Sequence, residues 1–333
     1  MKRRTILLLL TFIFIVTASN ALFARPVTIK VGSLVPKGSP WDRALRRIAA
    51  GWSEASDGEI IMKIYPGGIA GDEADMIRKM RFNQLQGGVF TSLGLNDLAP
   101  DTVALSVPFL ITSNEEYEYV FKRISPVLSE GIKKAGFQVI SWTQAGWIHF
   151  FSTKRIEYPE DLRKLKIAGS DIDPAMFQAW KTMGYTVLPI AMSDVATALS
   201  SGMVDACYNV PLGATAYQLY NVVDYMMDFP ISPVLGGFVM TDRAWNRIDD
   251  DLKPELLQIA SDVADDLYEN LQDLEQEAIS VLKKQGVEIV SVSRDAREEW
   301  RKEFEWGFEM VVGKSFSERI YNLINKHLEE FRN

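Results

Sequence analysis

Few side chains in this sequence could bind a metal or act as a nucleophile. The 333 residues include two histidines, His149 and His327, and one cysteine, Cys207. Zinc sites and iron–sulfur clusters are built mainly from cysteine and histidine, so neither kind of site is expected. A single cysteine also excludes a disulfide within the chain. We therefore predict no metal ion and no cofactor.

One glycine-rich stretch lies where a phosphate-binding loop would lie. Gly67-Gly68-Ile69-Ala70-Gly71 falls between an expected strand and an expected helix. Asp72 and Glu73 begin that helix, and their charges would repel a pyrophosphate at its N-terminus. We interpret the stretch as a plain turn.

The remaining candidates for chemistry also have structural explanations. Asp171 and Asp173 resemble the start of a calcium loop, but the glycine and the final glutamate of that motif are missing. Asp173, which precedes Pro174, is better explained as a helix N-cap. His149 lies in an apolar run and is expected to be buried and hydrogen-bonded. The chain is therefore predicted not to be an enzyme, with an exported enzyme that uses His149 as its base as the alternative.

The N-terminus has the pattern of a secretory signal. A basic start at 2–4 precedes an almost unbroken apolar run at 5–18, and cleavage is expected after Ala21 or as late as Ala24. The run is too short for a typical transmembrane helix, although an uncleaved anchor is the competing interpretation. Removal of 1–21 changes the formal charge from −8 to −11. Such an acidic protein is not expected to bind nucleic acid, and we predict that it is periplasmic.

The rest of the chain alternates between strand and helix patterns. Strands are expected at 27–34, 59–65, 87–93, 102–111 and 136–142, and a second set begins near His149 and includes 165–169, 186–189 and 204–210. Strands that alternate with helices predict parallel sheets with helices on both faces. Two such sets predict two α/β lobes with a cleft between them.

A long amphipathic helix is expected near the C-terminus. Apolar residues repeat at steps of three and four from Leu252 to Leu282. A helix of that length, at about 1.5 Å per residue, would reach roughly 45 Å. We expect it to lie along both lobes, with a coiled-coil dimer as the alternative. Two further amphipathic helices are expected at 294–309 and 315–331.

Several segments, in order along the chain, resemble the TRAP transporter solute-binding proteins. They are Tyr65-Pro66-Gly67-Gly68 with Gly71, Val107-Pro108-Phe109-Leu110, the stretch 158–167, and the stretch 198–209. The resemblance implies a two-lobed periplasmic binding protein fold with a ligand cleft and a long lobe-spanning helix. We expect lobe I at 25–148 plus 236–273 and lobe II at 149–235 plus 274–333. It also implies hinge closure on a solute and delivery to a TRAP membrane permease.

Two departures from the family pattern concern the ligand. Family members typically bind organic acids through an arginine at the position of Ala168, and many have a second arginine at the position of Ile148. A guanidinium group matches a carboxylate in shape and charge. Arg155 and Arg163 could substitute only by swinging inward, and both are expected at the surface. The sequence therefore predicts a ligand that is hydrophobic, or at least not a carboxylate.

The resemblance and these departures together suggest which residues contact the ligand. We expect the cleft to be lined by Trp41, Phe90, Thr91, Trp147, Ile148, Ala168, Met192, Tyr208 and Asn209. Such aromatic and aliphatic linings with a few polar groups suit hydrophobic molecules. The alternative is that these side chains simply pack the two lobes together.

The expected partners follow from the same resemblance. They are a small, apolar molecule and the TRAP permease subunits. The alternative is a periplasmic scaffold or sensor that presents its ligand to another protein, for which a tetratricopeptide-repeat partner is the candidate.

Overall fold

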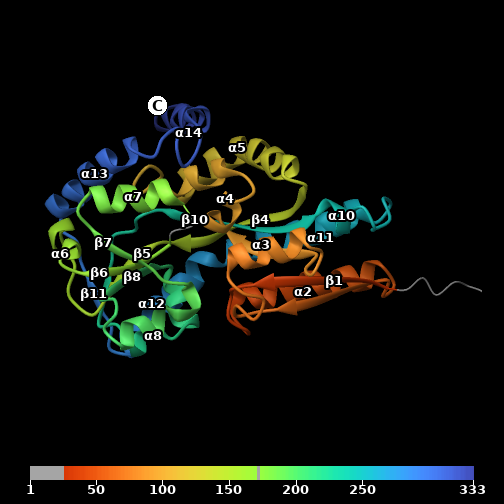
Figure 1. Ribbon diagram of the computed structural model, residues 1–333, viewed down its shortest axis with the longest axis horizontal. Coiled ribbons are helices and arrows are strands. Elements are labelled where there is room, and N and C mark those ends of the chain that lie inside the picture. Colours follow the sequence, from red (N-terminus) through yellow and green to blue (C-terminus); the bar gives the residue numbers. More distant parts are fainter. Residues whose placement is uncertain (1–25, 171–172) are drawn as a thin grey trace, which may run out of the picture.

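The computed structural model describes residues 26–170 and 173–333. The expected secretory signal at 1–21 and Asp171 lie outside these ranges. The described chain forms two sheets with helices packed around them (Figure 1).

The first sheet has the strand order β2-β1-β3-β10-β4. Its strands are β1 (Val27–Ser33), β2 (Ile60–Tyr65), β3 (Gly87–Thr91), β4 (Phe137–Trp147) and β10 (Pro233–Thr241). Strand β1 pairs in parallel with β2 and β3, whereas β10 runs antiparallel to β3 and β4. We call this sheet and its helices lobe I.

The second sheet has the strand order β11-β9-β5-β8-β6-β7. Its strands are β5 (His149–Ser152), β6 (Lys166–Gly169), β7 (Thr186–Pro189), β8 (Ala206–Asn209), β9 (Tyr225–Met227) and β11 (Glu288–Val290). Strand β6 is parallel to β7 and β8, and β5 is antiparallel to β8 and β9. We call this sheet and its helices lobe II.

The prediction of parallel sheets is wrong in one respect, because both sheets are mixed. Only Ile148 separates β4 of lobe I from β5 of lobe II, and 228–232 connects β9 to β10. These two direct passages between the lobes replace the crossover helices that parallel pairing requires. They make β5 and β10 the antiparallel members of their sheets.

The helices account for most of the remaining chain. They are α2 (Pro40–Ala55), α3 (Glu73–Arg81), α4 (Ser92–Asn96), α5 (Asn114–Lys134), α6 (Pro159–Arg163), α7 (Pro174–Thr182), α8 (Val195–Ser200), α9 (Pro211–Ala216), α10 (Asp242–Trp245), α11 (Lys253–Glu269), α12 (Leu271–Lys284), α13 (Arg294–Glu309) and α14 (Glu318–Arg332). Short 3-10 turns occur at Pro100–Ser106, Met192–Asp194 and Leu219–Asn221.

Two expected elements differ from the structure. The apolar segment 102–111 is not a strand, because its first part forms the 3-10 turn and Phe109 has a left-handed φ of 62°. The long helix is interrupted at Asn270, whose side-chain Nδ2 donates to the carbonyl of Asp266. Its first half, α11, packs on α2 and β4, and its second half, α12, packs on α9.

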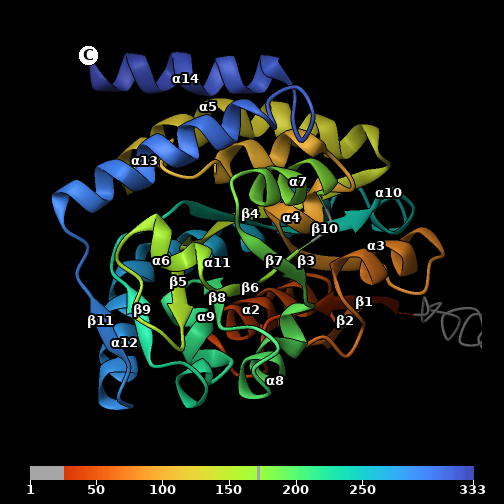
Figure 2. The ribbon, with the colours of Figure 1, turned by 60° about the vertical axis from the view of Figure 1, so that its left-hand side comes forward.

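The last helix, α14, lies beside α5 at one edge of the molecule (Figures 1 and 2). Arg332 of α14 forms an ion pair with Glu116 of α5 at 2.7 Å, and Ser317 donates to Asp101. Residues 318–332 therefore pack on a lobe I helix, although the expected boundaries place them in lobe II. Those boundaries stay a prediction.

The largest core cluster lies beneath α7 and α13. Trp180 of α7 contacts Phe150 of β5 and Phe304 of α13 edge to face, and Trp300 of α13 packs on both phenylalanines. Trp300 is fully buried, and its Nε1 donates to the carbonyl of Glu157 at 2.8 Å. This aromatic cluster fixes the position of α7 over the second sheet.

Candidate functional site

Side chains and loops from the two lobes meet at several places. Tyr217 of lobe II donates its hydroxyl to the carbonyl of Leu34, at the end of β1 in lobe I, at 2.7 Å. The glycine turn is also close to lobe II, because a Cβ placed on Gly68 would lie 4.0 Å from Ser193. The lobes therefore touch on the side where β1 and β2 end.

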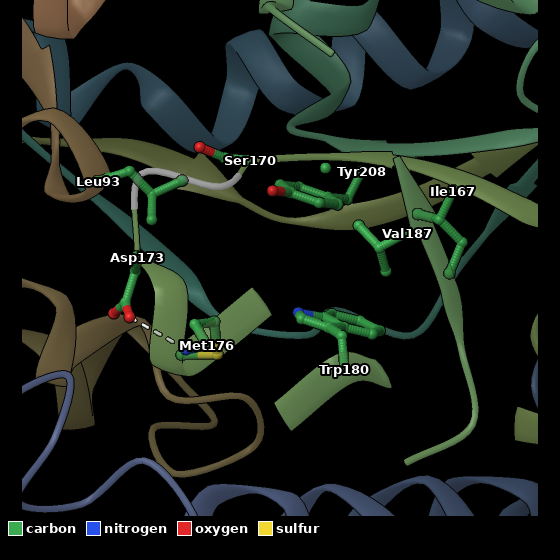
Figure 3. Close-up of a pocket in the computed structure, with 9 residues that line it drawn as sticks. Leu93, Ile167, Ser170, Asp173, Met176, Trp180, Val187 and Tyr208 are labelled. Atoms are coloured by element: carbon green, nitrogen blue, oxygen red, sulfur yellow. Dashed lines mark hydrogen bonds between the residues drawn. The ribbon is translucent and has the colours of Figure 1, made fainter. Parts of the chain in front are cut away.

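A small cavity lies between α4 of lobe I and the second sheet (Figure 3). Its volume is about 30 Å³, room for about one water molecule. The residues that line it are Leu93, Ile167, Gly169, Ser170, Asp173, Met176, Trp180, Val187 and Tyr208. Only Leu93 of these residues comes from lobe I, so the cavity lies largely within lobe II and is covered by lobe I on one side.

The cavity lies where β6 ends and α7 begins. Gly169 keeps this place free, since a Cβ there would lie 2.4 Å from Cγ1 of Val187. The rings of Tyr208 and Trp180 lie one above the other, and both are seen nearly edge-on in Figure 3. A space between two aromatic faces suits a flat or hydrophobic group.

Asp173 is the charged residue of this lining. It caps α7, and its Oδ1 accepts from the backbone nitrogens of Ala175 and Met176, each at 3.0 Å, and from Oγ of Ser315 at 2.9 Å. The side chain is buried, and its Oδ2 has no hydrogen-bond partner. The predicted N-cap role is confirmed, and one carboxylate oxygen is left over.

No lysine, arginine or histidine lines the cavity within the described ranges. Burial raises the pKa of Tyr208 to about 12, so this tyrosine is neutral at physiological pH. Arg155 pairs with Glu288 and Glu157, and Arg163 pairs with Glu160 and Glu303. Neither arginine reaches the cavity, as the sequence predicts.

The two positions that lack arginine do not line the cavity. Ala168 is 4% exposed and packs on the opposite side of β6, with Val195 and Cys207. Ile148 is half-buried, and its backbone exchanges hydrogen bonds with 231–232. Its side chain packs against the large core cluster.

Two expected ligand contacts on β3 have partners within lobe I. Phe90 is 2% exposed and belongs to the core around Met76 and Met80, so its ring faces away from the second lobe in this structure. The backbone N–H and the hydroxyl of Thr91 donate hydrogen bonds to the carboxylate of Glu73, at 2.5 and 3.0 Å. Burial raises the pKa of Glu73 to about 7.

Trp41 and Trp147 do not line the cavity, and each packs against helices elsewhere. Trp147 donates its backbone nitrogen to Glu275 of α12 at 2.9 Å, and its indole nitrogen to Asn114 of α5 at 2.7 Å. Burial raises the pKa of Glu275 to about 6. Trp41 of α2 packs against a cluster centred on Leu212 of α9, so it joins the lobes.

The last two expected contacts interact with each other. Asn209 at the end of β8 donates Nδ2 to the sulfur of Met192 at 3.7 Å, and its Oδ1 accepts from the nitrogen of Val210. Of the nine expected contacts, Tyr208 alone lines the cavity. The roles of all nine in ligand binding stay predictions.

His149 has the environment of a structural histidine. It is buried, and its Nδ1 lies 2.8 Å from the carbonyl oxygen of Met227. Burial lowers its pKa to about 4, so the ring is neutral at physiological pH. These contacts match the expectation of a buried, hydrogen-bonded ring.

The sequence reasoning missed Leu93, Met176, Trp180 and Val187 as cavity residues. The place of the cavity could have been predicted from the order of strands and helices, because ligands of open α/β sheets bind beyond the carboxyl ends of the strands. The end of β6 and the first turns of α7 are such a place.

The described part of the chain has neither a membrane-spanning helix nor a metal site. Its helices include none with the length and apolar character needed to cross a membrane. Within the same ranges, no group of His, Cys, Asp and Glu side chains could hold a metal ion.

Comparison with known proteins decides the family. Residues 31–310 match DctP, the bacterial extracellular solute-binding proteins of family 7. The chain belongs to this family. It is therefore a binding protein for small solutes and not an enzyme, and the family implies a TRAP permease as its membrane partner.

The relatives of this family 7 protein agree in fold and length. A solute-binding protein of Roseobacter denitrificans is 26% identical over 297 residues, which cover 84% of this chain and 88% of the relative. A TRAP periplasmic solute-binding protein from a Sulfitobacter species, solved with bound β-D-galacturonate, superposes with a TM-score of 0.83 at 18% identity. The superposition covers 91% of this chain and 99% of that one.

A third relative has a simpler ligand. A TRAP periplasmic solute-binding protein of Sulfurospirillum deleyianum, solved with succinate, gives a TM-score of 0.81 at 20% identity. The superposition covers 90% of this chain and 97% of the other. The two-lobed α/β periplasmic binding protein fold predicted from the sequence is confirmed.

Proposed function

We propose that this family 7 protein captures a hydrophobic solute that is not a carboxylate, between lobes I and II, for a TRAP permease. The observation that carries the proposal is the lining of the interlobe cavity. It is aromatic and aliphatic, and its charged member, Asp173, is an acid rather than an arginine. A carboxylate ligand there would face a carboxylate of the protein without a cation to pair with, which costs several kcal/mol.

A separate support for the proposal is the absence of the family arginines, whose two positions do not line the cavity. Ala168 and Ile148 stand where acid-binding members of the family are expected to carry them. Relatives of known structure bind galacturonate and succinate, both of which are acids. We infer that this protein does not bind organic acids, and that Tyr208 contacts its solute.

Binding follows from the position of the cavity. Leu93 contributes from lobe I, and eight residues contribute from lobe II or the segment after β6. A solute that contacts both sides binds the closed arrangement better than an open one, and therefore shifts the population toward closure. We propose hinge motion at the two direct passages between the lobes, near Ile148 and 228–232.

The partners and the location are proposed on the family resemblance. The secretory signal would be removed after Ala21 or Ala24, and the periplasmic protein would deliver its solute to the permease. A scaffold that hands the solute to a tetratricopeptide-repeat protein is the second candidate.

Titration calorimetry with succinate and D-galacturonate tests the proposed ligand class. The protein should first be unfolded, dialysed and refolded, because a retained solute would mask binding. We expect no saturable heat from either acid at millimolar concentration. Micromolar binding of either acid would show that the chain is an ordinary acid-binding member of its family.

A further inference from the structure

We propose that Glu275 links closure of the two lobes to the uptake of a proton. Its carboxylate contacts the end of β4 in lobe I from a helix that packs on lobe II, beside one of the two direct passages between the lobes. Closure is then favoured at acid pH and opposed at neutral pH. The inference rests on the hinge motion proposed above and not on the nature of the solute.

Glu275 is carried by lobe II but contacts lobe I. It lies on α12, whose Leu271 and Ala278 pack with Leu212 of α9. Its Oε1 accepts a hydrogen bond at 2.9 Å from the backbone N–H of Trp147, the last residue of β4. Rotation of one lobe against the other would move these two groups apart, because each belongs to a different lobe.

The backbone of β4 covers the carboxylate at Gly146. This glycine has a φ of 119°, and a Cβ on it would lie 2.4 Å from Oε1 of Glu275 and 3.2 Å from Cβ of Val210, just before α9. Only a residue without a side chain allows so close an approach. Glu275 is half-buried in this arrangement. Separation of β4 from α12 would let water reach its carboxylate.

The carboxylate has no cation to offset its burial. Among the ion pairs of residues 26–170 and 173–333, none includes Glu275. Two of the elements packed on α12, β4 and α9, contain no titratable residue at all. The donor from Trp147 is a neutral peptide group. Closure therefore buries a charge without pairing it.

The other elements near α12 add acids, and their cations are engaged elsewhere. The last turn of α11 and the exposed face of α12 carry acidic and phenolic groups, namely Asp265, Asp266, Tyr268, Glu269, Asp273 and Glu277. Helix α2 reaches this region through Trp41. Its arginines are occupied: Arg46 pairs with Asp42, Arg47 pairs with Asp266, and Arg43 donates to the carbonyl of Gly38.

The sign of the pH effect follows from this burial. Burial raises the pKa of Glu275 to about 6, from an ordinary value of 4.5, although the hydrogen bond from Trp147 acts in the opposite direction. In an open arrangement, water around the carboxylate returns the pKa toward its ordinary value. The closed arrangement thus binds the proton more tightly, and the closed fraction rises as the pH falls from about 7 toward 4.5.

A cysteine pair that joins the lobes measures closure. A Cβ on Gly68 of lobe I would lie 4.0 Å from Cβ of Ser193 in lobe II, within the range of a disulfide. Gly68→Cys with Ser193→Cys should therefore cross-link only when the lobes close, and the native Cys207 is buried. The rate of cross-linking by diamide is followed on non-reducing gels, with refolded and solute-free protein. Variants are compared at the same pH, which cancels the pH dependence of thiol reactivity.

Glu275→Gln in this cysteine background tests the assigned residue. Glutamine keeps an oxygen that can accept from Trp147 but cannot carry the charge. At pH 7.5 it should cross-link roughly tenfold faster than the protein with Glu275, and the ratio should narrow to a few-fold at pH 5. Glu277→Gln is the matched control, because it removes the same charge from an exposed position on the same helix. The control should cross-link at the rate of the protein with both glutamates.

A second measurement keeps Glu275 in place. The carboxyl carbon of Glu275 is titrated by NMR in the cross-linked and in the reduced cysteine protein. Its pKa should be higher by about one unit or more in the cross-linked form, because the lobes are then held closed. Equal pKa values in the two forms would overturn the proposal, even if Glu275→Gln failed to fold.

The remaining outcomes are also decisive. If Glu275→Gln cross-links no faster at pH 7.5, if its advantage is the same at pH 5, or if Glu277→Gln matches it, then closure is not linked to a proton on Glu275. If no variant cross-links at any pH, the lobes do not meet as described, and the proposed closure fails as well. Micromolar binding of succinate would overturn the proposed ligand class and leave the proton linkage intact.

Discussion

Ala168→Arg is expected to unfold the protein or to leave it strongly destabilised, without creating a carboxylate site. The alanine is 4% exposed and packs with Val195 and Cys207 in the core of lobe II. A larger side chain in a packed core typically costs about 1–3 kcal/mol, and a buried unpaired charge costs several more. Urea unfolding followed by circular dichroism measures the loss.

Lys166→Arg is the control for this substitution. It lies on the same strand, its side chain donates to the carbonyl of Gly202, and its charge is unchanged. We expect its unfolding free energy to stay within about 0.5 kcal/mol of the wild type. A fully stable Ala168→Arg protein that binds succinate would show that position 168 opens toward the solute. The missing arginine alone would then decide the ligand class.

Trp180→Ala is expected to destabilise the fold strongly. The indole lines the cavity beside α7 and contacts Phe150, Tyr185 and Phe304 in the core. Its loss should lower the unfolding free energy by about 3 kcal/mol.

Two comparison variants test this packing role of the indole. Trp306 is 51% exposed on α13, and Trp306→Ala should change the unfolding free energy by less than about 0.5 kcal/mol. Trp180→Phe should recover much of the stability, because an aromatic ring again packs at this position. If Trp180→Ala is as stable as Trp306→Ala, the indole does not hold α7 in place as described.

Local patterns predicted the elements of this fold well. Helix α13 matches its expected range of 294–309, and β1 and β2 lie within one residue of theirs. The apolar segment at 102–111 was misjudged because Val103 and Leu105 are buried by a 3-10 turn. Apolar content alone does not distinguish a buried turn from a buried strand. The antiparallel strands were missed because they depend on chain passages between lobes.

The site was harder to predict than the fold. A family position identifies a residue but does not say which way its side chain points, and alternate residues of a strand face opposite sides. Ile167 lines the cavity, whereas its neighbour Ala168 packs on the other side of β6. The N-cap role of Asp173 was predicted correctly, but the hydrogen bond that its Oδ1 accepts from Ser315 comes from a residue 142 positions away. Contacts at that separation leave no local pattern.

Native mass spectrometry of the protein purified from its own periplasm, followed by identification of whatever it releases on unfolding, tests the central claim most directly. The claim is that the solute is hydrophobic and carries no carboxylate. We predict a bound molecule at up to one copy per chain that lacks a carboxyl group. A sugar acid or a dicarboxylate bound at one copy per chain would contradict the claim.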